Sequence, residues 1–146
     1  LDQIDFALNH DKPIMVHARD AYQEILEIFE NGFGHSRTQY PNLRGNIHFF
    51  SGNLEIAKSF VALGFTLSFA GPITYALEYE EVIRNIPLES ILSETDSPFA
   101  APAPYRGKRN EPGYVVEVVK KIAEIRQEDF EAVRVQLVKN ALAMIS

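Results

Sequence analysis

Short apolar runs alternate along the chain with longer stretches in which apolar residues recur every three or four positions. Uninterrupted apolar runs are typical of strands that are covered on both faces, and the wider spacing is typical of amphipathic helices. The runs predict strands over residues 14–16, ending in His17, and over residues 45–50, 65–69 and 90–93.

Helices are expected between these strands and after the last one. Leu1, Ile4 and Leu8 share one face of a first helix that ends at residues 9–11. The other predicted helices cover residues 20–31 with Gly32 as C-cap, 53–63 with Asn53 as N-cap and Gly64 as its end, 75–85 more weakly, 114–125, and 130–137. Residues 34–42 are expected to form a polar loop, and residues 140–145 to continue the last helix or to form another.

This strand–helix rhythm predicts an α/β fold. Strands separated by helices pair in parallel with right-handed crossovers. Two architectures fit: a doubly wound open sheet, or successive units of a (β/α)8 barrel. A whole barrel takes about 250 residues, so a chain of 146 residues would be a half of one. The pattern therefore indicates four parallel strands, each followed by a helix, with extra C-terminal helices.

Composition narrows the class of protein. Apolar residues make up 46% of the chain, enough for a core, and no run of eighteen apolar residues indicates a membrane span. The absence of cysteine excludes disulfides, thiolate zinc sites and cysteine nucleophiles, and fits a cytoplasmic protein. Because Leu1 reads as the middle of a helix and no leader is visible, we expect residues 1–146 to be a single partial domain whose N-terminal portion lies upstream.

The stretch from residue 91 to residue 112 differs from the rest of the chain. The last apolar run is followed at once by Glu94, Thr95 and Asp96, where the strand should end. Acids at the carboxyl ends of parallel strands are typical of the sites of α/β proteins. Frequent prolines then exclude a helix or an inner strand, but permit a stiff, ordered loop. These prolines are Pro98, Pro102, Pro104 and Pro112.

The same loop carries three basic residues, Arg106, Lys108 and Arg109, although the net charge of the chain is −6. That acidic balance argues against wholesale wrapping of nucleic acid, but not against a nuclease, whose bound metals supply local positive charge. Arginine is better suited than lysine to a two-pronged contact with phosphate. The pattern indicates an anion site beside the acids, and the alternative is a solvated loop with charged side chains.

Two histidines complete a candidate metal site. His17 ends the first predicted strand and His48 lies on the second. Because the carboxyl ends of parallel strands lie on one side of the sheet, both imidazoles should converge with Asp96. Imidazole and carboxylate groups suit zinc, manganese or magnesium. Taken singly, each histidine could be structural, and His10 and His35 are expected at the surface.

Other polar groups admit two interpretations. Ser51 and Ser68 could touch a ligand, and Ser51 could be a nucleophile if a base lay beside it. Gly52 and Asn53 could form an anion-binding helix start or a plain cap. No glycine-rich phosphate loop supports a nucleotide-cofactor enzyme.

Three blocks of this sequence resemble the TatD family of metal-dependent deoxyribonucleases. The first two are similar to its Pro-x-x-x-His-x-Arg-Asp strand and its Gly-x-x-His-Cys-Phe-Ser-Gly strand, here with Phe49 in the usual cysteine place. The third is similar to its Glu-Thr-Asp signature with the later basic stretch. They stand here as Pro13 to Asp20, Gly45 to Gly52, and Glu94 to Pro98 with Arg106 to Pro112.

The resemblance implies a TIM-like barrel that hydrolyses DNA phosphodiester bonds with a metal-activated water and divalent ions such as Mg, Mn or Zn. His17, His48 and Asp96 would be the metal ligands. Asp96 would also orient or deprotonate the attacking water, with Glu94 as the supporting catalytic carboxylate. The implied substrate-binding residues are Arg19, Ser51, Arg106, Lys108 and Arg109.

The family's remaining ligands, a His-x-His and a further Glu, belong to its N-terminal half, and neither motif occurs in this chain. We therefore expect DNA and an N-terminal half of the barrel as partners. Two alternatives remain. One is a related hydrolase of a small-molecule amide, ester or lactone, and the other is an inactive half-barrel that serves as an interaction module.

Overall fold

The computed structural model describes residues 2–31 and 43–145, and it has the expected alternation of strands and helices. The strands are β1 (Ile14–His17), β2 (Gly45–His48), β3 (Phe65–Phe69) and β4 (Ile91–Ser93). The α-helices are α1 (Asp2–Asn9), α2 (Tyr22–Asn31), α3 (Leu54–Ala62), α4 (Glu80–Asn85), α5 (Val115–Arg126) and α6 (Phe130–Ile145). Short 3-10 segments are η2 (Gly71–Thr74), η3 (Leu77–Tyr79), η4 (Leu88–Ser90) and η5 (Pro112–Tyr114).

The four strands form one parallel sheet in the order β1-β2-β3-β4. In its register His17 is paired with His48, and Phe69 with Ser93. The carboxyl ends of all four strands therefore lie at the same end of the sheet. This confirms the predicted α/β class with parallel strands, each followed by helical structure.

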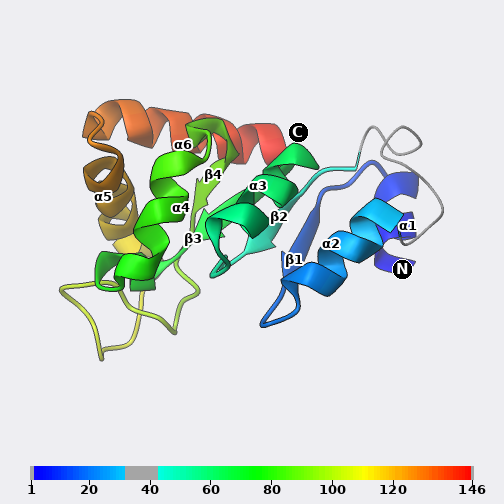
Figure 1. Ribbon diagram of the computed structural model, residues 1–146. Helices are drawn as coiled ribbons and strands as arrows, with labels where there is room; N and C mark the ends of the chain where they lie inside the picture. The colour runs from blue at the N-terminus through cyan, green and yellow to red at the C-terminus, as the bar shows by residue number, and fades with distance from the viewer. Residues whose placement is uncertain (1, 32–42, 146) are drawn as a thin grey trace.

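Helices α2, α3 and α4 lie on one face of the sheet (Figure 1). Helix α6 crosses the end of the sheet where the strands begin, and the loop after β4 projects from the opposite end. The main hydrophobic core is formed by buried residues of the strands and of the helices packed on them. Its largest fully buried side chains are Phe50, Phe60, Phe69, Ile47, Leu67, Ile73, Ile83, Ile91 and Ile122. Among the described residues, β1 and β4 are the edge strands.

Some element boundaries differ from those expected. Strand β2 ends at His48 rather than at residue 50, because Phe49 has a φ of 51° and turns the chain out of the ladder. The helix expected from residue 75 starts only at Glu80, after two 3-10 turns. The last strand starts at Ile91, because Leu88–Ser90 is a 3-10 turn. Asn53 caps α3 as predicted, through its side-chain oxygen and the Ile56 N–H.

The C-terminal residues continue α6 as one helix to Ile145, which settles the choice left open by the sequence. Gly32, His35 and the polar loop over residues 34–42 lie outside the described residues. No helix in the described ranges is both long enough and apolar enough to span a membrane.

The proline-rich loop is held by one buried side chain, that of Asn110, which is only 2% exposed. Its Nδ2 donates hydrogen bonds to the carbonyls of Thr95 and Phe99, at 2.7 and 2.6 Å. Its own N–H donates to the Pro98 carbonyl at 3.0 Å. Both ends of the loop are thereby tied together beside β4, as expected of an ordered loop.

The loop also packs on η2. The Ala103 N–H donates to the Thr74 hydroxyl at 2.8 Å. A Cβ at Gly71 would collide with the Ala100 carbonyl oxygen and would lie 2.7 Å from the Pro102 nitrogen. Only glycine therefore permits this close approach.

Candidate functional site

The strand ends bring the predicted metal ligands to one place. His17 and His48 end the neighbouring strands β1 and β2, and their ring centroids are 5.7 Å apart. Glu94 follows β4, and its N–H donates to the Phe69 carbonyl at 3.0 Å, which extends the ladder by one residue. Asp96 comes two residues later. The sequence argument placed His17, His48 and Asp96 on one side of the sheet, and the structure has them there.

These side chains line an open pocket of about 380 Å³ at the carboxyl ends of the strands. Its lining also includes Arg19 and Ser51, two of the candidate substrate-binding residues, and Tyr79, which the sequence analysis did not select. The whole lining is His17, Ala18, Arg19, His48, Phe49, Ser51, Tyr79 and Asp96.

His48 lies between the two acids. Its Nε2 is 3.5 Å from Asp96 Oδ1, and its Nδ1 is 2.5 Å from Glu94 Oε2. The Nδ1 atom is buried and has no hydrogen-bond partner, because the close carboxylate oxygen is not aligned with it for a hydrogen bond. The imidazole is therefore flanked by carboxylates on both nitrogens.

Groups on or next to the two middle strands, β2 and β3, hold the Glu94 carboxylate in place. Its Oε1 accepts hydrogen bonds from the Phe49 N–H at 2.7 Å and from the Ser68 hydroxyl at 2.5 Å. The Asn46 side-chain amide donates to the Ser68 oxygen at 2.8 Å. This chain of contacts, Asn46–Ser68–Glu94, holds one carboxylate oxygen in the sheet and turns the other toward His48.

Ser68 is only 3% exposed, so it is placed to hold Glu94 rather than to touch a ligand. The sequence left both interpretations open for this residue. Asn46 was not selected at all. The available signal was the polar character of Asn46 and Ser68 at inner positions of apolar strands, where a buried polar side chain needs a partner.

Ser51 is exposed and bonded to a phenol. Its N–H donates to the Tyr22 hydroxyl at 3.0 Å, and its own hydroxyl lies 3.2 Å from the same oxygen. Neither an imidazole nor a carboxylate is among these partners. The geometry fits a serine that presents its hydroxyl to a ligand, and gives no support to a serine nucleophile.

Tyr79 brings a neutral hydrogen-bonding group to the pocket. Burial raises the pKa of its phenol, and the nearby Glu78 carboxylate raises the pKa further. The phenol therefore keeps its proton at neutral pH and can donate it to a bound oxygen. Nothing in the sequence around residue 79 indicated this role.

Backbone conformation at the site is unusual for residues with side chains. Phe49, Asp96 and Asp20 have φ of 51°, 56° and 55°. Residues other than glycine rarely adopt this left-handed region, which costs free energy. Two of these residues, Phe49 and Asp96, line the pocket, so this backbone shapes the candidate site directly.

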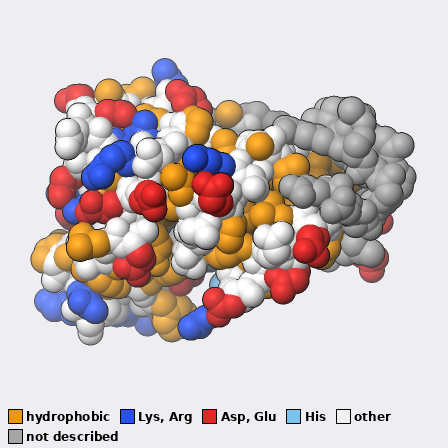
Figure 2. Space-filling model, viewed as in Figure 1, with side chains coloured by type: hydrophobic (Ala, Val, Ile, Leu, Met, Phe, Trp, Pro, Cys, Tyr) orange, Lys and Arg blue, Asp and Glu red, His pale blue; other side chains and the backbone are white. Residues whose placement is uncertain are grey.

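The loop cations lie outside this pocket. Arg106 has its guanidinium carbon 4.1 Å from the centre of the Tyr75 ring, and Lys108 and Arg109 are exposed. Figure 2 shows basic side chains beside hydrophobic ones on the part of the molecule where Figure 1 shows the loop. The three cations, within four positions of one exposed loop, form a basic surface and are not among the pocket's lining residues.

The donor set fits a divalent metal in its chemistry. Two imidazoles and a carboxylate are ligands for zinc and manganese, and Nε2 of His48 lies 3.5 Å from Asp96 Oδ1. In residues 2–31 and 43–145, however, no group of three or more such side chains is arranged closely enough to hold a metal ion. His17, His48 and Asp96 share the pocket, but their arrangement does not by itself form a metal site.

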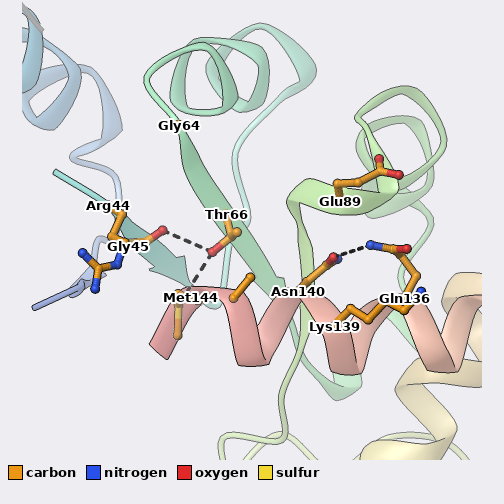
Figure 3. A pocket seen from close by; sticks show the side chains of 10 residues that line it. Arg44, Gly45, Gly64, Thr66, Glu89, Gln136, Lys139, Asn140 and Met144 are labelled. Carbon is orange, nitrogen blue, oxygen red and sulfur yellow. Dashed lines mark hydrogen bonds between the residues drawn. The ribbon is translucent and has the colours of Figure 1, made fainter. Parts of the chain in front are cut away.

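A second pocket lies at the opposite end of the sheet (Figure 3). It has a volume of about 400 Å³ and lies between the beginnings of the strands and α6. Thr66 donates to the Gly45 carbonyl at 3.2 Å, and Gln136 donates to Asn140 at 2.7 Å. The histidines and acids described above are absent from its lining, so the catalytic candidates lie at the carboxyl ends alone.

Comparison with known families decides the relationship. Residues 1–146 match the family described as TatD related DNase. The chain belongs to the TatD family. This confirms the resemblance found in the sequence blocks.

Several TatD relatives have been curated as metal-dependent hydrolases. The chain is 37% identical over 142 residues to the uncharacterized metal-dependent hydrolase YabD of Bacillus subtilis, covering 96% of this chain and 53% of that protein. It is 36% identical over 126 residues to the uncharacterized metal-dependent hydrolase YcfH of Escherichia coli K12, covering 85% of this chain and 44% of that protein. The chain thus spans about half the length of the curated relatives it matches.

Solved structures agree on the fold. YjjV, a TatD homolog from Escherichia coli K12, superposes with a TM-score of 0.86 at 29% identity, covering 99% of this chain and 54% of that one. A TatD family hydrolase from Entamoeba histolytica superposes with a TM-score of 0.80 at 17% identity, covering 99% of this chain and 54% of that one. At that identity the second likeness shows the fold alone.

Proposed function

We propose that this chain is part of a divalent-metal-dependent hydrolase, and that the reaction is the hydrolysis of DNA phosphodiester bonds. The observation that carries the proposal is the convergence of His17, His48 and Asp96 on one pocket at the carboxyl ends of parallel strands. The family description and the curated names of the relatives support metal-dependent hydrolysis. The absence of cysteine supports a cytoplasmic location.

Each residue has a distinct role in this proposal. His17, His48 and Asp96 would hold the metal, which when bound supplies Lewis-acid activation of water and of the phosphoryl oxygen. Asp96, partly exposed beside His48, accepts the proton of the attacking water. Glu94 keeps the His48 ring turned toward the pocket. The hydrolysis assay compares Mg, Mn and Zn as the metal that supports the reaction.

Substrate contacts come from two sets of residues. Arg19, Ser51 and Tyr79 line the pocket and can donate hydrogen bonds to phosphate oxygens. The basic surface formed by Arg106, Lys108 and Arg109 would attract the rest of the DNA backbone, with an affinity that falls as salt rises.

The test is hydrolysis of a labelled oligodeoxynucleotide with Mg²⁺, Mn²⁺ and Zn²⁺ in turn. The assay uses the chain alone and the chain mixed with the complementary half of the Bacillus subtilis relative, the part that this chain does not match. We expect slow cleavage by the chain alone and faster, metal-dependent cleavage by the mixture, because three ligands make an incomplete two-metal site. Asp96→Asn should lower the rate by on the order of 100-fold or more.

Arg109→Ala separates substrate binding from chemistry. It should weaken DNA binding and flatten its salt dependence while leaving metal content unchanged, and Asp96→Asn should do the reverse. Equal turnover by the chain alone and by the mixture would show that the missing ligands are dispensable. Metal-dependent hydrolysis of a neutral ester, amide or lactone, with none of DNA, would replace the deoxyribonuclease proposal with the small-molecule one.

A further inference from the structure

Phe99 exposes a large apolar ring on the loop that follows Asp96 of the candidate site. Its side chain is 70% exposed, and it follows Asp96 by three residues. Its backbone is fixed, because its N–H donates to the Asp96 carbonyl at 2.9 Å and its carbonyl accepts from Asn110 at 2.6 Å. The ring is therefore held out from an ordered loop rather than carried on a loose one.

A single exposed apolar residue is normal on protein surfaces, but a second one, Leu77, follows the segment on which the loop of Phe99 packs. Leu77 is 76% exposed and lies two residues from Tyr79, which lines the pocket. The segments that carry Phe99 and Leu77 belong to one packed unit, joined by the hydrogen bond from Ala103 to Thr74. The exposed apolar groups thus occur on the two segments that continue from the rim of the site.

Cations accompany this apolar surface. Arg106, from the same loop as Phe99, stacks on the Tyr75 ring at 4.1 Å. Lys108 and Arg109, two and three positions further along the chain, are also exposed. A loop that exposes both an aromatic ring and basic side chains matches the chemistry of a nucleotide chain, whose bases stack on aromatic rings and whose phosphates attract cations.

We propose that Phe99 is a stacking platform for a base of the DNA substrate, adjacent to the bond that is cleaved. This inference rests on the proposed function and adds to it the residue that engages a base rather than a phosphate. The ring face selects for a flat group and reads no particular base, because every base has a π-face. Phe99 then positions substrate, whereas Asp96 and the histidines act on the reacting atoms.

The chain contains no tryptophan, so Phe99→Trp introduces a single indole at the proposed platform. We expect its fluorescence to be quenched when an oligodeoxynucleotide is added without metal, and to remain unchanged with an abasic oligomer of equal length. The matched control is Phe6→Trp, on α1 beside β1 at the other end of the strand order, where the side chain is 59% exposed. Its fluorescence should not respond to either oligomer.

Binding of a labelled oligodeoxynucleotide by the unlabelled protein gives the second measurement. Phe99→Ala should weaken binding of the base-bearing oligomer by roughly ten-fold, since stacking of one base on an aromatic ring is worth roughly 5- to 150-fold in affinity. It should leave binding of the abasic oligomer unchanged, and Phe99→Trp should bind the base-bearing oligomer as tightly as the natural chain.

Two results would overturn the inference: a Phe99→Ala variant that binds the base-bearing oligomer normally, or equal effects on the two oligomers. The second result would mean that Phe99 supports the loop or docks another protein. Because binding is measured without metal, failure of hydrolysis leaves the test of Phe99 intact. If the protein cleaves DNA in a metal-dependent way but Phe99→Ala leaves oligomer binding unchanged, only the proposed role of Phe99 is contradicted.

Discussion

At the scale of single residues, the site depends on how one carboxylate is held. Glu94 is anchored through Oε1 to Ser68 and to the Phe49 N–H, and it faces the His48 ring through Oε2. Buried ligand-orienting groups of this kind set the direction in which an imidazole points. The direction of the His48 ring therefore depends on Ser68, which does not itself line the pocket.

Ser68→Ala tests this support. The change removes one donor from Glu94 and leaves the Asn46 amide, which is buried, without the Ser68 oxygen that accepts its hydrogen bond. We expect the free energy of unfolding to fall by about 1–3 kcal/mol, the cost of unsatisfied buried polar groups. Urea unfolding measures it. Ser59→Ala on α3, which loses only a surface bond to the Glu55 carbonyl, should change it by less than about 0.5 kcal/mol. Equal effects of the two changes would contradict the account.

The sequence predicted which residues gather at the pocket better than it predicted the contacts that hold them. His17, His48 and Asp96 could be found because strand ends in a parallel sheet lie on one side, a rule that needs only the order of elements. Asn46, Ser68 and Tyr79 could not, because their roles depend on contacts between strands and turns distant in sequence.

At the scale of elements, the proline-rich loop is an ordered connection between β4 and α5. Asn110 closes it, and it rests on η2 at Gly71. The prolines predicted a stiff loop, but the surface on which it packs is set by Gly71, some thirty residues earlier. The positive φ of Phe49, which ends β2 early, was likewise invisible in a run of apolar residues.

Gly71→Ala should push the loop away from η2, because the new methyl group meets the Ala100 carbonyl. We expect a loss of about 1–3 kcal/mol in the free energy of unfolding, as for other overpacked positions. Gly113→Ala is the matched control, since a Cβ there meets nothing within 4 Å. Thermal or urea unfolding compares the two variants. A Gly71→Ala protein as stable as the control would show that the loop is not packed as described.

At the scale of the whole molecule, four parallel strands leave β1 and β4 as edges among the described residues. The chain spans about half the length of the relatives with which it shares its fold. A closed barrel has no edges, and its inward-facing residues pack against an opposite wall. The expectation that residues 1–146 form one partial domain stays a prediction.

The central claim is that His17, His48 and Asp96 belong to a metal site, and calorimetric titration with Zn²⁺ tests it most directly. Mutating a group that only orients a ligand lowers metal affinity by roughly 10–100-fold, so His48→Ala and Asp96→Asn should each weaken binding by at least roughly ten-fold. His10→Ala, which removes an exposed imidazole beside Phe6, should bind Zn²⁺ as the natural chain does. Unchanged affinity in His48→Ala and Asp96→Asn, or an equal loss in His10→Ala, would contradict the account.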